Sequence, residues 1–216
     1  MYHRGPDAGG SQFFARDRIA LGHRRLSIID LTAAGNQPMQ LNSLWVVFNG
    51  EIYNFPALRK ELRALGCQFS SRSDTEVLLH GYKVWGERLC EHLEGMFAFA
   101  IYDQSTGKVY LARDHVGQKP LYYAVFGGHF VAASEIKAIH AFAARRFACR
   151  RESVLDFLVY DYVPDPHTWY QDVLSIMPGS FLKVDRTDGG FRLEESVYWN
   201  YTPPVEPDPI TPEDAL

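Results

Sequence analysis

The sequence predicts a layered α+β domain in which antiparallel sheets are stacked and helices lie on the outside. Two antiparallel hairpins are indicated, one joining residues 97–102 to 108–112 and the other joining 121–125 to 129–133 through Phe-Gly-Gly. A group of strand-like segments and two amphipathic helices precede them. Because the strands do not alternate regularly with crossover helices, the pattern does not favour a doubly wound parallel fold.

The first quarter of the chain supplies the earlier strands. Residues 18–22 and 26–31 have strand-like composition and lead into a turn at 33–36. The apolar run 44–48 predicts a buried strand that stops at Asn49-Gly50, since Asn-Gly is typical of a turn.

Helix signals follow this strand. Asn54 can cap a helix that has Pro56 in its first turn and ends at Gly66. Ser73 and Glu76 have the capping-box spacing, which predicts a second helix that runs toward Trp85. Shorter helices are expected at residues 135–141 and 152–159.

Length and composition suit one domain with a tail. Of the 216 residues, 46% are hydrophobic and 14% are aromatic, which is enough for a sizeable core. Residues 1–200 are expected to form the domain. Residues 202–212 contain five prolines, and proline interrupts helices and central strands, so residues 201–216 are predicted to be a linker toward another domain.

Charge and hydropathy exclude several classes of protein. A formal net charge of −4 argues against a nucleic-acid partner, which requires a basic face. No apolar run approaches the roughly 18 residues of a membrane helix, and residues 1–7 lack an apolar secretion signal. Cys67, Cys90 and Cys149 are too widely spaced for a disulfide framework or a metal-binding CxxC pair. The sequence therefore predicts a cytoplasmic protein.

The common catalytic motifs do not occur in the sequence. It contains no GxxxxGK[ST] or GxGxxG loop for phosphates, no HExxH and no G-x-S-x-G elbow. The eight histidines are scattered, and a lone histidine is more often structural than a metal ligand. No metal or cofactor is therefore expected in this domain.

What remains is a series of blocks rich in Arg, Asn, Gly and Asp, among them HRGPD, GHRRLSIID, NQPM and FNGEIYN. The nine blocks lie at residues 3–7, 22–30, 36–39, 48–54, 73–77, 95–100, 112–123, 133–138 and 178–179. In order and spacing, the chain resembles the class II glutamine amidotransferase domain of asparagine synthetases. RLSIID and NGEIYN are the asparagine-synthetase forms of blocks that differ in other class II amidotransferases.

The resemblance implies an N-terminal-nucleophile (Ntn) hydrolase fold, which is a four-layer αββα sandwich of antiparallel sheets with helices outside. It implies hydrolysis of L-glutamine to glutamate and ammonia. The ammonia would pass to a synthetase domain, in cis or in trans, that uses ATP and Mg²⁺ to amidate aspartate. Homodimerisation is a further implication of the resemblance.

The resemblance also assigns roles to individual residues. The Asn49 side-chain amide and the Gly50 backbone N–H would form an oxyanion hole. Arg25 would pair with the α-carboxylate of glutamine, while Asp74 and Glu51 would receive its α-ammonium. Leu26, Ile28 and Ile29 would belong to the same pocket wall.

Each of these roles has a structural alternative. Asn49-Gly50 can be an ordinary turn. Asp74 also lies within a helix-start signal, and Arg25 can be one of three neighbouring surface cations. The Arg113-Asp114-His115 block is expected to organise the end of a sheet or a domain interface.

The sequence departs from the family pattern at the nucleophile. The family uses a cysteine at the mature N-terminus, where the α-amine can act as the base. This chain begins at Met1, two residues before HRGPD, so a strand is expected to be missing from one sheet. None of Cys67, Cys90 and Cys149 has an α-amine beside it. We therefore expect no glutaminase activity from these 216 residues alone.

Two origins and two functions stay open. The chain can be a fragment or the product of a misplaced start, which the intact glutamine blocks favour, or a truly shortened homologue. It can be the glutaminase part of an asparagine synthetase, or of a relative that amidates another carboxylate. The alternative is a non-catalytic module that binds glutamine or a partner.

Overall fold

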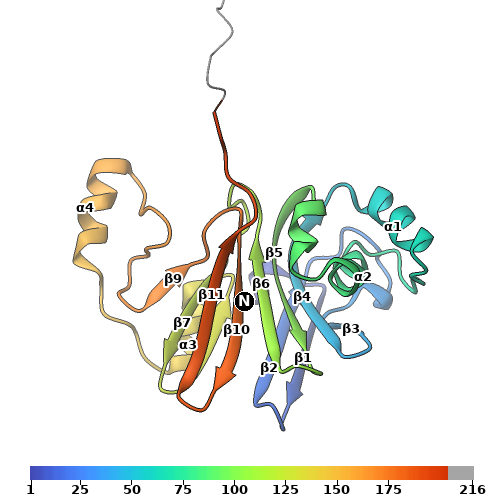
Figure 1. Cartoon of the computed structure of the whole chain (residues 1–216). Coiled ribbons are helices and arrows are strands. Elements are labelled where there is room, and N and C mark those ends of the chain that lie inside the picture. The colour runs from blue at the N-terminus through green and yellow to red at the C-terminus, as the bar shows by residue number, and fades with distance from the viewer. Residues whose placement is uncertain (204–216) are drawn as a thin grey trace, which may run out of the picture.

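The computed structural model describes residues 1–203 and contains a six-stranded antiparallel sheet at its centre (Figure 1). The order of the strands is β11-β10-β6-β5-β4-β3. Their bounds are β3 Met39–Leu41, β4 Leu44–Ile52, β5 Gly95–Asp103, β6 Lys108–Arg113, β10 Ser180–Thr187 and β11 Gly190–Val197. β4 and β5 pair over nine residues, from Leu44 opposite Asp103 to Ile52 opposite Gly95.

A second β layer covers one face of this sheet in two pieces. One piece is the hairpin of β1 (Ala8–Phe14) and β2 (Ile19–Arg25), and the other is the β8-β7-β9 sheet. Its strands are β7 Tyr122–Phe126, β8 His129–Ala133 and β9 Val173–Ser175. A cavity of about 140 Å³ is lined by residues of β2 and β8 together.

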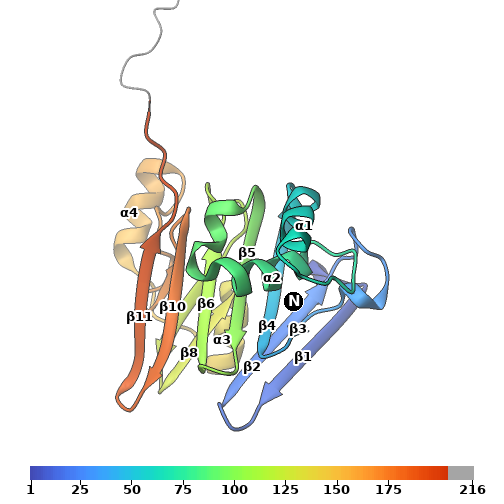
Figure 2. The ribbon, with the colours of Figure 1, turned by 45° about the vertical axis from the view of Figure 1, so that its right-hand side comes forward.

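Helices form the two outer layers (Figures 1 and 2). α1 (Phe55–Ala64) and α2 (Thr75–Trp85) pack on the other face of the six-stranded sheet, and α3 (Ile136–Ala143) packs on the outer face of β7 and β8. The layer order is therefore αββα, as predicted. α4 (Arg151–Tyr160) stands at a corner away from the sheets (Figure 1). Short 3-10 helices lie at Tyr2–Arg4, Ala33–Gly35 and Gly86–His92.

Apolar side chains alternate between the two faces of the central sheet. On β4, Val46 and Phe48 face the helices, whereas Trp45 and Val47 face the β1-β2 hairpin. This alternation follows from the two-residue period of a strand. Both faces of β4 therefore pack against other layers, one against the helices and the other against the β1-β2 hairpin.

The local signals for helices and hairpins are confirmed, although some caps bond differently from the prediction. α1 follows Asn54, but the Asn54 side chain bonds the backbone of His92 and Glu94 rather than the helix. α2 begins after Asp74, and the Glu76 carboxylate accepts hydrogen bonds from Ser70 and Ser71 instead of closing a capping box. Both helices start where expected, although neither start has a side-chain cap bond.

Several strand predictions were wrong. Residues 26–31 form no strand, and the side chains of Leu26, Ile28 and Leu31 are exposed. β4 does not stop at Asn49-Gly50, because its pairing with β5 continues to Ile52. β1, β3, β9, β10 and β11 were not predicted from the sequence. The proline-rich linker prediction falls largely on residues 204–216, which lie outside the described part of the chain.

The Arg113-Asp114-His115 block organises one end of the sheets. Arg113 donates to Ser175 Oγ at 2.8 Å and to the carbonyl oxygen of Ile176 at 2.7 Å, which ties β6 to β9. Asp114 is fully buried and accepts hydrogen bonds from the backbone N–H groups of Phe97 and Lys119.

Within residues 1–203, no helix is long and apolar enough to cross a membrane.

We expect Leu62→Ala to lower the free energy of unfolding by about 2–5 kcal/mol, because the substitution leaves a cavity between α1 and the sheet. Leu62 is 0% exposed and belongs to the core between the helices and the six-stranded sheet. Leu65→Ala is the matched control, since Leu65 is 57% exposed and its loss should change stability by less than about 0.5 kcal/mol. Denaturant titrations measure both variants, and equal losses would contradict this packing.

Candidate functional site

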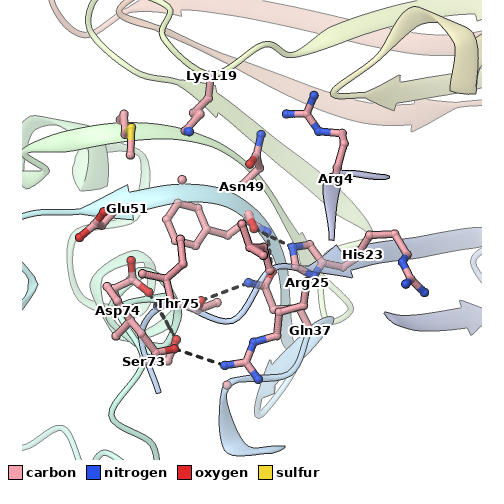
Figure 3. A pocket seen from close by; sticks show the side chains of 18 residues that line it. Arg4, His23, Arg25, Gln37, Asn49, Glu51, Ser73, Asp74, Thr75 and Lys119 are labelled. Atoms are coloured by element: carbon pink, nitrogen blue, oxygen red, sulfur yellow. Dashed lines mark hydrogen bonds between the residues drawn. The ribbon is translucent and has the colours of Figure 1, made fainter. Parts of the chain in front are cut away.

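A cavity of about 280 Å³ lies where β2, β4 and the start of α2 meet (Figure 3). It brings together all eight residues to which the resemblance assigns a role. They are Arg25, Leu26, Ile28, Ile29, Asn49, Gly50, Glu51 and Asp74. Ten further described residues line the cavity, among them His23, Gln37 and Lys119, which lie within the nine blocks but had no predicted role.

The cavity exists because β4 is longer than its neighbour β3. The pairing of these strands ends with Met39 opposite Val46, so the edge of β4 beyond that point has no partner strand. Side chains from distant segments bond this edge instead. The Phe48 N–H donates to Gln37 Oε1 at 2.6 Å, and the Ile52 N–H donates to Asp74 Oδ2 at 3.1 Å. Such partners remove the cost of leaving buried backbone groups unpaired.

The Gly50 N–H lies on the same edge, between these two capped donors. Successive N–H groups of a strand alternate in direction, so those of residues 48, 50 and 52 point away from β5. No side chain among the described residues bonds the Gly50 N–H. Gly50 has φ +153°, and a Cβ there would collide with the carbonyl oxygen of Met96, so only glycine fits.

Asn49 presents a second free donor to the cavity. Its Nδ2 atom is buried and has no hydrogen-bond partner among the described residues. In Figure 3 the Asn49 side chain points to the side of β4 on which Lys119 and Arg4 lie. A buried amide donor without a partner is costly unless a ligand supplies the acceptor. Asn49 and Gly50 therefore each offer an unpartnered donor within the described residues that line the cavity.

Asp74 places a carboxylate without a counter-ion in the cavity wall. It is 5% exposed, and no Lys or Arg of the described residues forms an ion pair with it. Burial raises the pKa of its carboxyl above the ordinary value, against the effect of the Ile52 N–H bond. A ligand ammonium would satisfy this charge. Glu51 also lines the cavity, on the same strand as Asn49.

Arg25 lines the cavity but directs its terminal donors at the adjoining loop. Nη1 donates to the Thr32 carbonyl oxygen and to Asn36 Oδ1, both at 2.9 Å. Nη2 donates to the carbonyl oxygens of Ile29 and Asp30. Arg25 is thus a buried residue that shapes the loop, rather than one of a group of surface cations. Its pairing with a ligand carboxylate stays a prediction.

His23 joins β2 to the open edge of β4. Its Nε2 atom lies 2.9 Å from the carbonyl oxygen of Phe48, which can only accept, so Nε2 carries the proton. Burial, with Arg25 and Arg24 nearby, lowers the pKa of His23. The imidazole is therefore neutral near pH 7, with Nδ1 buried and unpartnered among the described residues.

Among the described residues, no cysteine lines the cavity. Cys90 is buried in the core beside Tyr110, and burial raises its pKa to about 12. Cys67 is half-buried beside the core that α1 and α2 cover, and Cys149 is exposed. Within the described residues, the cavity therefore offers donors, two carboxylates and a neutral imidazole, but no thiol.

Residues 1–199 match the family model described as a glutamine amidotransferase domain. The chain belongs to this family. Asparagine synthetase [glutamine-hydrolyzing] 1 of Bacillus subtilis is 38% identical over 205 residues, which cover 94% of the amidotransferase chain and 32% of the relative. A putative asparagine synthetase [glutamine-hydrolyzing] of Mycobacterium tuberculosis is 35% identical over 224 residues, with 98% and 34% covered. The chain thus spans about a third of these relatives.

A solved structure supports the predicted fold of the amidotransferase chain. The glutamine phosphoribosylpyrophosphate amidotransferase from B. subtilis, complexed with ADP and GMP, matches with a TM-score of 0.55 and 26% identity. The match covers 81% of this chain and 34% of that one. The prediction of an Ntn-type α+β fold is confirmed, with a second sheet that here is divided into two pieces.

We expect the free energy of unfolding to fall as the pH drops from 7 to 5.5, across the ordinary histidine pKa of about 6.5. Burial is the first cause that lowers the pKa of His23, His80 and His115. The unfolded chain therefore takes up protons that the folded chain does not. For each of these histidines, the free energy of unfolding should fall by at most about 1.4 kcal/mol per pH unit.

Denaturant titrations at several pH values measure this slope. His23→Gln can still donate to the Phe48 carbonyl oxygen but cannot titrate, so it should flatten the slope. A stability that is constant or that rises on acidification would contradict the expectation.

Proposed function

We propose that the cavity binds L-glutamine for hydrolysis to glutamate and ammonia. The unpartnered Asn49 Nδ2 atom beside the Gly50 N–H is the observation that carries this proposal, because both donors suit the carboxamide oxygen. Asp74 and Glu51 would hold the α-ammonium. Arg25 would hold the α-carboxylate, with Leu26, Ile28 and Ile29 in the surrounding wall.

The same two donors are suited to the chemical step. When a thiolate attacks the carboxamide carbon, negative charge develops on the oxygen, and donors already in place stabilise it. Neither donor has to break a bond with a side chain first, because neither has a side-chain partner among the described residues. The thiol itself is not among the residues that line this cavity.

We further propose that the ammonia serves a synthetase domain, in cis or in trans, which uses ATP and Mg²⁺ to amidate aspartate. The similarity to glutamine-hydrolysing asparagine synthetases supports this role. A related chain that amidates another carboxylate would have the same cavity. The absence of a thiol at the cavity favours a second candidate for these 216 residues, which is glutamine binding without hydrolysis.

We expect the purified chain to bind L-glutamine and the Asp74→Asn variant to bind it at least about tenfold more weakly. Loss of one charge-assisted hydrogen bond costs about 1.5–3 kcal/mol. The carboxamide introduced by this substitution would keep an oxygen for the Ile52 N–H, so the fold should persist. Asp188→Asn is the matched control, since Asp188 is exposed in the β10–β11 turn. Calorimetric titrations measure all three affinities.

A folded wild-type chain that does not bind glutamine would refute the binding proposal. Ammonia release should be measured in parallel and should not exceed a buffer blank. Release with ordinary saturation would show instead that the chain is catalytic without a thiol at the cavity.

A further inference from the structure

Gln37 connects two walls of the cavity through a single side-chain amide (Figure 3). The residue is 8% exposed and lies between the Ala33–Gly35 turn and β3. Its Oε1 accepts the Phe48 N–H at 2.6 Å, and its Nε2 donates to Thr75 Oγ1 at 3.2 Å. One bond therefore reaches β4 beside Asn49, and the other reaches the first residue of α2 beside Asp74.

The bond to Phe48 decides which donors of β4 stay free. The N–H groups of Phe48, Gly50 and Ile52 lie on one edge, about 6.7 Å apart along the strand. Gln37 occupies the first and Asp74 occupies the third. Gly50 alone, within residues 48–52 of this edge, keeps a donor that no side chain bonds. If the Gln37 bond were lost, the Phe48 N–H would be free to bond water or to compete with the Gly50 N–H for the ligand.

The amide is the chemical group that this position requires. A carboxamide offers an acceptor and a donor at once, so it can accept from the backbone of β4 and donate to a hydroxyl. Both of its partners belong to structures that hold predicted ligand groups, since Asn49 and Gly50 follow Phe48, and Asp74 precedes Thr75. The side chain thereby links the segment that holds the carboxamide donors to the segment that holds the ammonium site.

We propose that Gln37 is a positioning residue that keeps the Asn49–Gly50 donor pair in register with Asp74. This inference rests on the proposed function, because it concerns how the cavity recognises the carboxamide of glutamine. Gln37 does not touch the reacting atoms. It acts by holding the Phe48 N–H, and through it the strand on which both donors lie.

The test compares two ligands with the same α-ammonium and α-carboxylate, L-glutamine and L-norvaline, of which only glutamine carries a carboxamide. Gln37→Met keeps the length of the side chain but loses both hydrogen bonds. We expect its affinity for glutamine to fall about tenfold or more, whereas its affinity for norvaline should change less than about threefold. Gln40→Met is the matched control, because Gln40 is exposed on β3 and should leave both affinities unchanged.

Amide hydrogen exchange provides a second measurement that needs no ligand. In Gln37→Met, exchange of the Phe48 amide should become faster, while the Val47 and Asn49 amides, which point toward β5, should stay protected. If Gln37→Met does not fold, Thr75→Val can be used instead, because it breaks only the bond at α2. It should still lower the affinity for glutamine more than the affinity for norvaline. Unchanged exchange at Phe48, or equal losses for both ligands, would overturn the positioning role. A wild-type chain that binds neither ligand would refute the proposed function instead.

Discussion

The difference in length between β3 and β4 is the constraint on which the cavity depends. β4 pairs with β5 over nine residues, but β3 accompanies β4 only as far as Val46. The remaining edge of β4 lies inside the molecule, where unpaired backbone groups are costly. Side chains of Gln37, His23 and Asp74 take the place of a strand. The same contacts that complete the sheet therefore shape the site.

This arrangement explains why the cavity holds both satisfied and unsatisfied groups. The backbone groups at Phe48 and Ile52 are bonded, whereas the Asn49 amide donor and the Asp74 charge have no protein counterpart among the described residues. Leaving such groups unsatisfied lowers the stability of the empty fold. A ligand with a carbonyl oxygen at one end and an ammonium at the other would supply a partner to both the Asn49 donor and the Asp74 carboxylate. Glutamine has this pattern.

The electrostatic balance of the site also involves His23, which the sequence analysis did not single out, and contacts of Arg25 that it did not predict. His23 supplies a neutral donor to β4, and its pKa is lowered by burial and by the neighbouring arginines. Arg25 uses its terminal donors to hold the loop that carries Ile29 and Asp30. A ligand carboxylate would have to compete with the carbonyl oxygens of this loop, which couples the conformation of the loop to binding.

The sequence by itself determined the four α-helices of residues 1–203 and the two predicted hairpins, because helix-start signals and turns involve contiguous residues. The eight cavity residues followed from the resemblance of short blocks to a known family. It did not determine the path of the chain at 26–31 or at Asn49-Gly50. An apolar run and an Asn-Gly pair each permit two local structures, and only the pairing of Gly50 with Phe97 on β5 extends β4 past the expected turn. The role of Gln37 was equally hidden, since its partners lie 11 and 38 residues away. Contacts at such separations arise from strand register and packing, which no local pattern encodes.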